Sequence, residues 1–149
     1  MTARVFFRTK PSPSVKKLAP LLRKAALSAL AGVKKKGEVG LVIVADEEIK
    51  RLNRTFLSHT GTTDVIAFNH PEPAFVPPGE TAPFGDIYIC LPQARRQADK
   101  MGHSLETELL ILAVHGALHL SGMDDATAPL RRKMNERTVS LLNKLVTSG

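Results

Sequence analysis

The 149-residue chain is long enough for one hydrophobic core and short for two, so we expect a single domain over residues 1–149. A composition of 43% hydrophobic and 23% charged residues excludes a disordered polyelectrolyte. No stretch approaches about 18 uninterrupted apolar residues, and the N-terminus lacks the apolar run of a signal peptide, which predicts a cytoplasmic protein with no membrane partner. The single cysteine, Cys90, excludes an internal disulfide and a four-cysteine zinc site, so a metal would need His, Asp or Glu ligands.

The formal charge of +7 is concentrated at the N-terminal end of the chain. Residues 1–36 contain ten Lys or Arg and no acid, whereas the remaining residues contain eleven bases and fourteen acids. This asymmetry predicts a polyanionic partner that touches the N-terminal element. A basic face that is merely solvated explains the same charge equally well.

The first half of the chain predicts a strand, a helix, a strand and a helix. A short strand is expected over residues 4–8, and apolar residues at helical spacing predict a helix around residues 14–31. Pro20 either lies in the first turn of a helix that begins near Ala19 or kinks a longer one. Residues 39–45 are a nearly continuous apolar run, typical of a strand covered on both faces, and Asp46 is the expected N-cap of a helix that reaches about residue 56.

The second half predicts two strands and three helices. The strands are expected over residues 64–69 and 86–91, each starting with an aspartate that caps backbone amides, and residues 70–84 hold five of the ten prolines and predict an exposed loop. The helices are expected over residues 92–100, 105–120 and 129–145, with Ser104 capping the second one. Together these elements predict an α/β (α+β) fold, with a single mixed sheet of about four strands and helices packed on it.

The most informative motif is His115-Gly-Ala-Leu-His119-Leu-Ser-Gly122-Met-Asp124-Asp125, in the predicted central helix. Histidines at i and i+4 share one helix face, about 5–6 Å apart at Cβ, which is close enough to share one metal ion. Gly122 predicts the end of the helix, after which the chain can bring Asp124 or Asp125 back toward the imidazoles. Two nitrogens and one carboxylate would leave a fourth tetrahedral position open, as in catalytic zinc sites. Two satisfied core histidines are the alternative interpretation.

The spacing H-x3-H-x5-D also resembles that of metzincin proteases, whose second position is the glutamate that acts as general base. Gly116 occupies that position here, which makes a metalloprotease the least favoured function. Beside a metal, this glycine would leave room for a substrate backbone to approach. The other histidines, His59, His70 and His103, have no such partners in the sequence and are expected to be exposed or at helix ends.

Residues 115–125 resemble the motif H-G-x-L-H-L-x-G-Y-D-H of the YbeY family of metal-dependent endoribonucleases, which mature ribosomal RNA. Three further blocks agree with the family in order and spacing; they are Leu52-Asn53, Thr63-Asp64-Val65-Ile66-Ala67-Phe68 and Gly85-Asp86-Ile87. Together the resemblance covers roughly residues 40–145. The resemblance implies cleavage of single-stranded RNA, one zinc ion per chain, and ribosomal RNA and small-subunit ribosomal proteins as partners. It implies His115, His119 and Asp125 as metal ligands, with His115 also catalytic.

The chain departs from this family pattern at two positions. Asp125 stands where the family has its third histidine, which makes the ligand set more anionic and harder. Leu57 stands where the family has an arginine that assists at the phosphate, and Arg54, about one turn earlier, is the candidate to supply that charge. These departures motivate an alternative function, a ribosome-assembly factor with little or no nuclease activity.

In either case the basic N-terminal helix is expected to hold the RNA backbone without reading its sequence. The side chains expected to make these phosphate contacts are Lys16, Lys17, Arg23 and Lys24.

Overall fold

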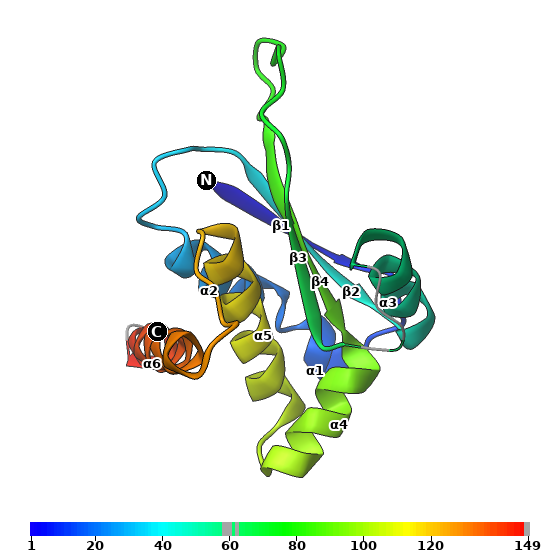
Figure 1. Ribbon diagram of the computed structural model, residues 1–149. Coiled ribbons are helices and arrows are strands. Elements are labelled where there is room, and N and C mark those ends of the chain that lie inside the picture. Colours follow the sequence, from blue (N-terminus) through cyan, green and yellow to red (C-terminus); the bar gives the residue numbers. More distant parts are fainter. Residues whose placement is uncertain (58–60, 62, 148–149) are drawn as a thin grey trace.

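Four strands form one mixed sheet in this computed structural model, which describes residues 1–57, 61 and 63–147 (Figure 1). The sheet order is β1-β2-β4-β3, in which β1, β2 and β4 are parallel and β3 is antiparallel to β4. The predicted fold class and strand number are therefore confirmed. The strands are β1 (Thr2–Phe7), β2 (Glu38–Val44), β3 (Val65–Asn69) and β4 (Pro83–Cys90).

Helices cover the two faces of the sheet unequally (Figure 1). Two long helices, α2 and α5, pack together against one face, with α6 on their outer side, whereas α3 and the short π-helix η1 cover part of the other face. None of the described helices is long and apolar enough to cross a membrane. The helices are α1 (Pro13–Lys16), α2 (Ala19–Ala29), α3 (Asp46–Leu52), η1 (Asn53–Leu57), α4 (Leu91–Met101), α5 (Leu105–Leu120) and α6 (Ala128–Thr147).

Strand β2 lies in the middle of the hydrophobic core. Every residue from Val39 to Val44 is buried, and alternate side chains belong to two separate apolar clusters. Leu41 and Ile43 pack with α2 and α5, whereas Val42 and Val44 pack with α3. The uninterrupted apolar run thus reflects burial on both faces, as predicted.

The predicted helix over residues 14–31 is two helices. Ser12 caps α1, and the chain breaks around Lys17 before α2 begins at Ala19 with Pro20 in its first turn. The first interpretation of Pro20 is therefore confirmed, since a proline in the first turn removes no intrahelical hydrogen bond.

Two predictions about aspartates are wrong. Asp46 is the first residue of α3, not its N-cap, and its carboxylate accepts hydrogen bonds from Arg96 and the Cys90 thiol. Asp86 lies inside β4, which begins three residues earlier, and its carboxylate lies 2.8 Å from His70 Nε2 instead of capping backbone amides. In both cases a side chain distant in sequence competes successfully with the local backbone.

Candidate functional site

The two motif histidines lie one turn apart on α5. Nine residues of this helix are buried, but His115 and His119 are both partly exposed. Because α5 lies against the sheet and is flanked by α4 and α6, the histidines are held on a rigid element.

A tight chain reversal after α5 brings a carboxylate to the second histidine. The N–H of Gly122 donates to the His119 carbonyl at 3.0 Å, and the N–H of Met123 donates to the Leu118 carbonyl at 3.0 Å. These two bonds form a Schellman motif, which needs the positive φ of 104° that Gly122 adopts. The reversal places Asp125 Oδ2 3.6 Å from His119 Nε2.

The ring of His119 is oriented by the same turn. Its Nδ1 lies 3.2 Å from the Met123 carbonyl oxygen, and since a carbonyl only accepts, Nδ1 donates this hydrogen bond. In the neutral ring Nε2 then carries the lone pair and faces the Asp125 carboxylate, so two electron-pair donors face each other across 3.6 Å. A cation between them, or a proton on the ring, makes this arrangement favourable.

The His115 imidazole is partly buried on α5. Burial lowers its pKa below the ordinary value and the neighbouring His119 lowers it further, while Asp64, Glu108 and Asp125 act in the opposite direction. A neutral imidazole is the form that can bind a metal or accept a proton.

Asp124, the other candidate carboxylate, is engaged with the local backbone. Its Oδ1 accepts hydrogen bonds from the N–H groups of Asp125 at 2.7 Å and Ala126 at 3.1 Å. Its role in this structure is to hold the turn that positions Asp125.

The donor types of His115, His119 and Asp125 suit zinc, and the orientation of His119 is the one that zinc ligands typically have. Among residues 1–57, 61 and 63–147, however, no three His, Cys, Asp or Glu side chains lie close enough together to hold a metal ion. His119 and Asp125 already face each other, and His115 stands one turn away.

Gly116 does not have the role expected from the sequence. It faces the sheet. A Cβ added there would come closer than 3.0 Å to the Ile87 side chain and would lie 3.3 Å from the Val65 side chain. It therefore allows close packing of α5 on β3 and β4 and makes no room for a substrate backbone. A protease base at this position would be buried against Ile87, which further disfavours that function.

A group of polar residues beside His115 was missed by the sequence analysis. Glu108 is buried, and its carboxylate accepts from Gln97 Nε2 at 3.1 Å and lies 2.6 Å from His103 Nε2. Gln97 Nε2 also donates to Asp64 Oδ2 at 3.2 Å, while Asp64 Oδ1 accepts from the Val65 N–H as predicted. The available signal was helical spacing, since Glu108 precedes His115 by seven residues, two turns, on the same helix.

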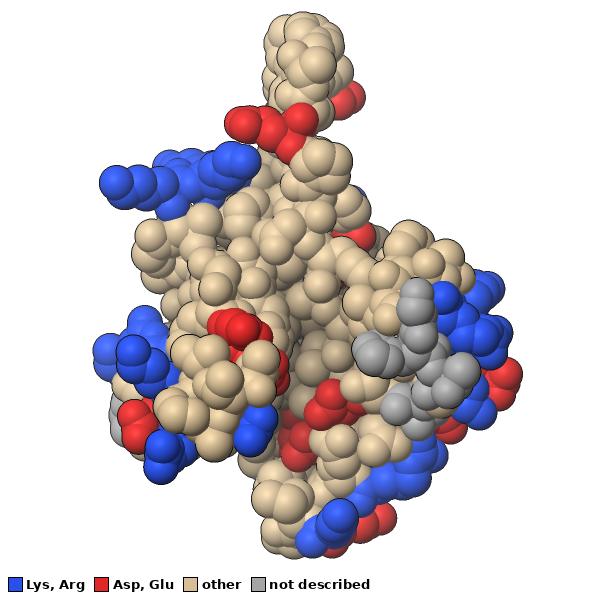
Figure 2. Space-filling model, in the orientation of Figure 1, with Lys and Arg blue, Asp and Glu red and all other residues tan. Residues whose placement is uncertain are grey.

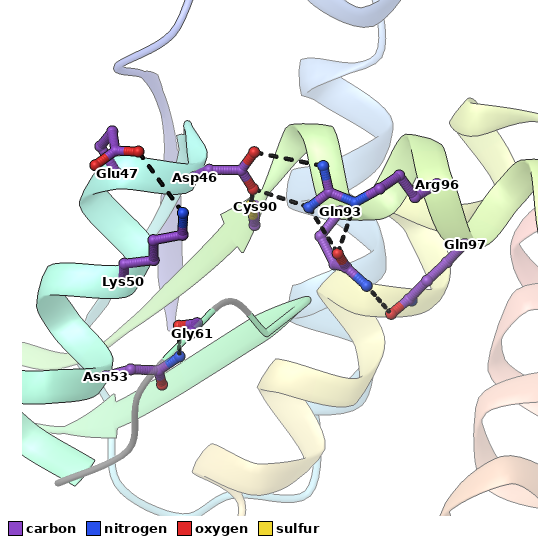
Figure 3. A network of polar contacts seen from close by, with 9 residues as sticks. All are labelled: Asp46, Glu47, Lys50, Asn53, Gly61, Cys90, Gln93, Arg96 and Gln97. Carbon is purple, nitrogen blue, oxygen red and sulfur yellow. Dashed lines mark hydrogen bonds and ion pairs between the residues drawn. The ribbon is translucent and has the colours of Figure 1, made fainter.

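A chain of hydrogen bonds through Arg96 and Gln93, which precede Gln97 on α4, orients the Gln97 side chain (Figure 3). Arg96 donates both to the Asp46 carboxylate and to the side-chain oxygen Oε1 of Gln93, and Gln93 Nε2 in turn donates to Gln97 Oε1 at 3.3 Å. With Oε1 occupied, the Gln97 amide nitrogen must point at the two carboxylates. The network thus ensures that Asp64 and Glu108 both accept hydrogen bonds from the amide nitrogen of Gln97.

The remaining predicted residues lie away from the histidine motif in sequence. Arg54 and Leu57 are exposed on η1, and Leu57 is 42% exposed. The four basic residues predicted to bind RNA are exposed on or directly after α1 and on α2, which packs against α5; they are Lys16, Lys17, Arg23 and Lys24. His70 is exposed as predicted, whereas His59 lies outside the described residues.

Comparisons of the sequence with known proteins agree on one family. A sequence model described as endoribonuclease YbeY matches residues 8–146. A protein named endoribonuclease YbeY from Elusimicrobium minutum is 44% identical over 147 residues, which cover 97% of this chain and all of that protein. Its namesake from Thermus thermophilus is 45% identical over 111 residues, covering 72% of this chain and 76% of that one. A solution structure from Thermotoga maritima shares the fold, with a TM-score of 0.60 and 22% identity over 98% of this chain and 93% of the other.

Proposed function

The chain belongs to the endoribonuclease YbeY family, and we propose that it cleaves single-stranded RNA in ribosomal RNA maturation, with zinc bound by His115, His119 and Asp125. The observation that carries the metal assignment is the orientation of His119, whose Nδ1 donates to Met123 while Nε2 faces Asp125. When bound, zinc supplies Lewis acidity that stabilises the negative charge developing on a phosphate.

The protein's own residues provide the rest of the proposed chemistry. The Met123 carbonyl keeps His119 in the tautomer whose Nε2 can bind a cation. Burial keeps His115 neutral near pH 7, so that it can act as a ligand or accept a proton. Arg54 would offset charge on the scissile phosphate in place of the family arginine, whose position is held by Leu57.

Metal analysis tests the ligand set. The parent protein, supplemented with zinc and freed of excess, should contain about one zinc per chain, and His119→Ala should lose it. His70→Ala is the matched control, because it removes an exposed imidazole that contacts Asp86 on the β3–β4 hairpin. Absence of stoichiometric zinc from the parent protein would contradict the metal assignment.

RNA cleavage tests the activity and separates it from the alternative function. Parent protein with zinc should cut a single-stranded RNA, and His115→Ala should not. Binding without metal-dependent cleavage would support the ribosome-assembly factor, which the departures at Asp125 and Leu57 favour.

The basic helices α1 and α2 provide the proposed contacts to the RNA backbone. Replacing their four exposed bases with glutamine should reduce the slope of log affinity against log salt by up to about 3, since each phosphate contact to single strands contributes about 0.7; the four are Lys16, Lys17, Arg23 and Lys24. Zinc content should stay unchanged. A fall in zinc content would show that these helices support the metal site.

A further inference from the structure

A cavity of about 550 Å³ opens beside His115, bounded by α4, α5, α6 and the residue that precedes β3. This volume lies in the range of sites that bind small organic molecules. The cavity extends the histidine site in the direction away from Asp125, since it includes His115 but neither His119 nor Asp125. An RNA held at the histidines would therefore have the cavity next to it.

One wall of the cavity offers hydrogen-bond acceptors. It carries the carboxylates of Asp64 and Glu108, and Gln97 lies between them. Both amide hydrogens of Gln97 are used by these carboxylates, so that this side chain has no donor left for a ligand. Each carboxylate oxygen can accept a second hydrogen bond, and the wall is therefore complementary to N–H groups.

The carboxylate wall is preorganised. The Glu108 side chain is only 7% exposed and is held by both His103 and Gln97. The Asp64 carboxylate is held by Gln97 and by the backbone N–H of Val65 at 2.8 Å. Neither group has to lose rotational freedom when a ligand binds, which favours a selective hydrogen bond.

The remaining walls are mainly apolar, and Lys100, Asn135 and Thr138 also line them. Ile111 and Leu112 from α5, Val139 and Leu142 from α6, and Met101 at the end of α4 line the cavity. Met101 and Val139 are 69% and 57% exposed, so apolar surface extends to the rim. A ligand with flat apolar faces and N–H groups on one edge matches these walls.

We propose that this cavity binds one unpaired RNA base that carries an exocyclic amino group, which is adenine, cytosine or guanine. The proposal rests on the proposed RNA-cleaving function and deepens it by naming the base that lies next to the cleavage site. Uracil has a carbonyl oxygen where cytosine has an amino group, so that its one edge N–H, at N3, is flanked by two carbonyl oxygens, and the carboxylates would repel these acceptors. The two carboxylates would repel a phosphate in the same way, and they outnumber the one lysine of the lining, Lys100.

The charges around the hollow agree with this orientation of the RNA. Figure 2 shows acidic atoms along the hollow in the centre of this face, while Lys and Arg lie mainly around its margins. A strand whose phosphates follow the margins can insert a base into the acidic hollow. The basic margins would thus attract the phosphates, and the acidic hollow would accept the base.

Nucleosides test the cavity without requiring cleavage. The isotopically labelled full-length protein would be titrated with adenosine, cytidine and uridine and followed by heteronuclear NMR. We expect adenosine and cytidine to bind about tenfold more tightly than uridine, which is the worth of a hydrogen bond to a charged group, with shifts at cavity residues such as Gln97 and Ile111. Equal affinities, or shifts elsewhere, would overturn the proposal.

Glu108→Gln tests the acceptor wall, and Glu106→Gln is its matched control on the same helix, outside the cavity. The amide presents a donor, so Glu108→Gln should bring the preference over uridine close to one, whereas Glu106→Gln should preserve it. An unchanged preference in Glu108→Gln would overturn the proposal. So would saturation of the same residues by Mg²⁺ or Mn²⁺ at low millimolar concentration, which would identify a cation site instead.

The zinc-dependent cleavage assay is run on the same parent protein. Base discrimination without cleavage would leave the cavity site intact and refute the proposed activity. Cleavage without base discrimination would refute only the cavity site.

Discussion

Gly116→Ala is the change whose effect follows most directly from the packing of α5. An alanine Cβ at this position would lie closer than 3.0 Å to Ile87 Cγ2, 3.2 Å from Ile87 Cγ1 and 3.3 Å from Val65 Cγ2. Ordinary carbon contacts are about 3.5–4.0 Å, so α5 and β4 must separate by at least about 0.5 Å. The Ile87 methyl is attached at Cβ of a β-branched residue and cannot rotate away freely.

The expected loss of stability is about 2 kcal/mol. Overpacking a buried contact costs about 1–3 kcal/mol, and the rigid neighbour places this case near the upper end. Alanine recovers about 1 kcal/mol over glycine inside a helix. For a chain of this size the net loss corresponds to a fall of about 4–8 °C in Tm.

Urea and thermal unfolding followed by far-ultraviolet circular dichroism measure this loss. Gly32→Ala is the control, because nothing lies within 4 Å of an added Cβ there, and its stability should change by less than about 0.5 kcal/mol. In an Ile87→Ala background Gly116→Ala should cost little, because the side chain it meets has been removed. An unchanged unfolding midpoint, or an equal loss in both backgrounds, would refute the idea that Gly116 sets the spacing between helix and sheet.

Three further predictions concern stability and reactivity. Cys90 should react with iodoacetamide at pH 8 far more slowly in the folded chain than in urea, since burial raises the pKa of its thiol to about 11; equal rates by mass spectrometry would contradict this. Asp46→Asn should lower the urea midpoint above about pH 4, because the hydrogen bond from Arg96 holds the pKa of that carboxyl below its usual value, and the difference from the parent should close as the pH falls through that lowered pKa. A difference in urea midpoint that does not change with pH would argue against a stabilising role of the Asp46 charge. Ser104→Ala should cost about 1 kcal/mol by removing the 3.1 Å hydrogen bond from the Thr107 N–H, whereas Ser104→Asp should retain most of the stability in the same unfolding assay.

Local patterns were sufficient for most of the elements and for the histidine motif. The predicted bounds of α5 agree with the structure at both ends, because Ser104 is a strong start signal and Gly122 a strong stop signal within the chain itself. The number of strands and their places along the chain followed from runs of apolar residues. The family resemblance, seen in the motif around His115, is confirmed by the match over residues 8–146.

Contacts between distant segments decided what local patterns could not. Spacing placed a glycine beside the histidines, but the packing of α5 on β4 determined that Gly116 faces Ile87 and not a substrate. Spacing also placed Asp64 at the start of a strand, and it lies directly before β3, yet only the fold brings it to Gln97.

The acidic cavity shows the same division. Asp64, Gln97 and Glu108 come from a loop and two helices, and no local periodicity relates them. Burial of Glu108 makes its contacts with Gln97 and His103 necessary, because a buried carboxylate without partners is costly. That burial exists only once α4, α5 and the sheet have packed. The sequence by itself therefore determined the helix and the residue types of the histidine motif, and the tertiary structure decided what lies next to His115.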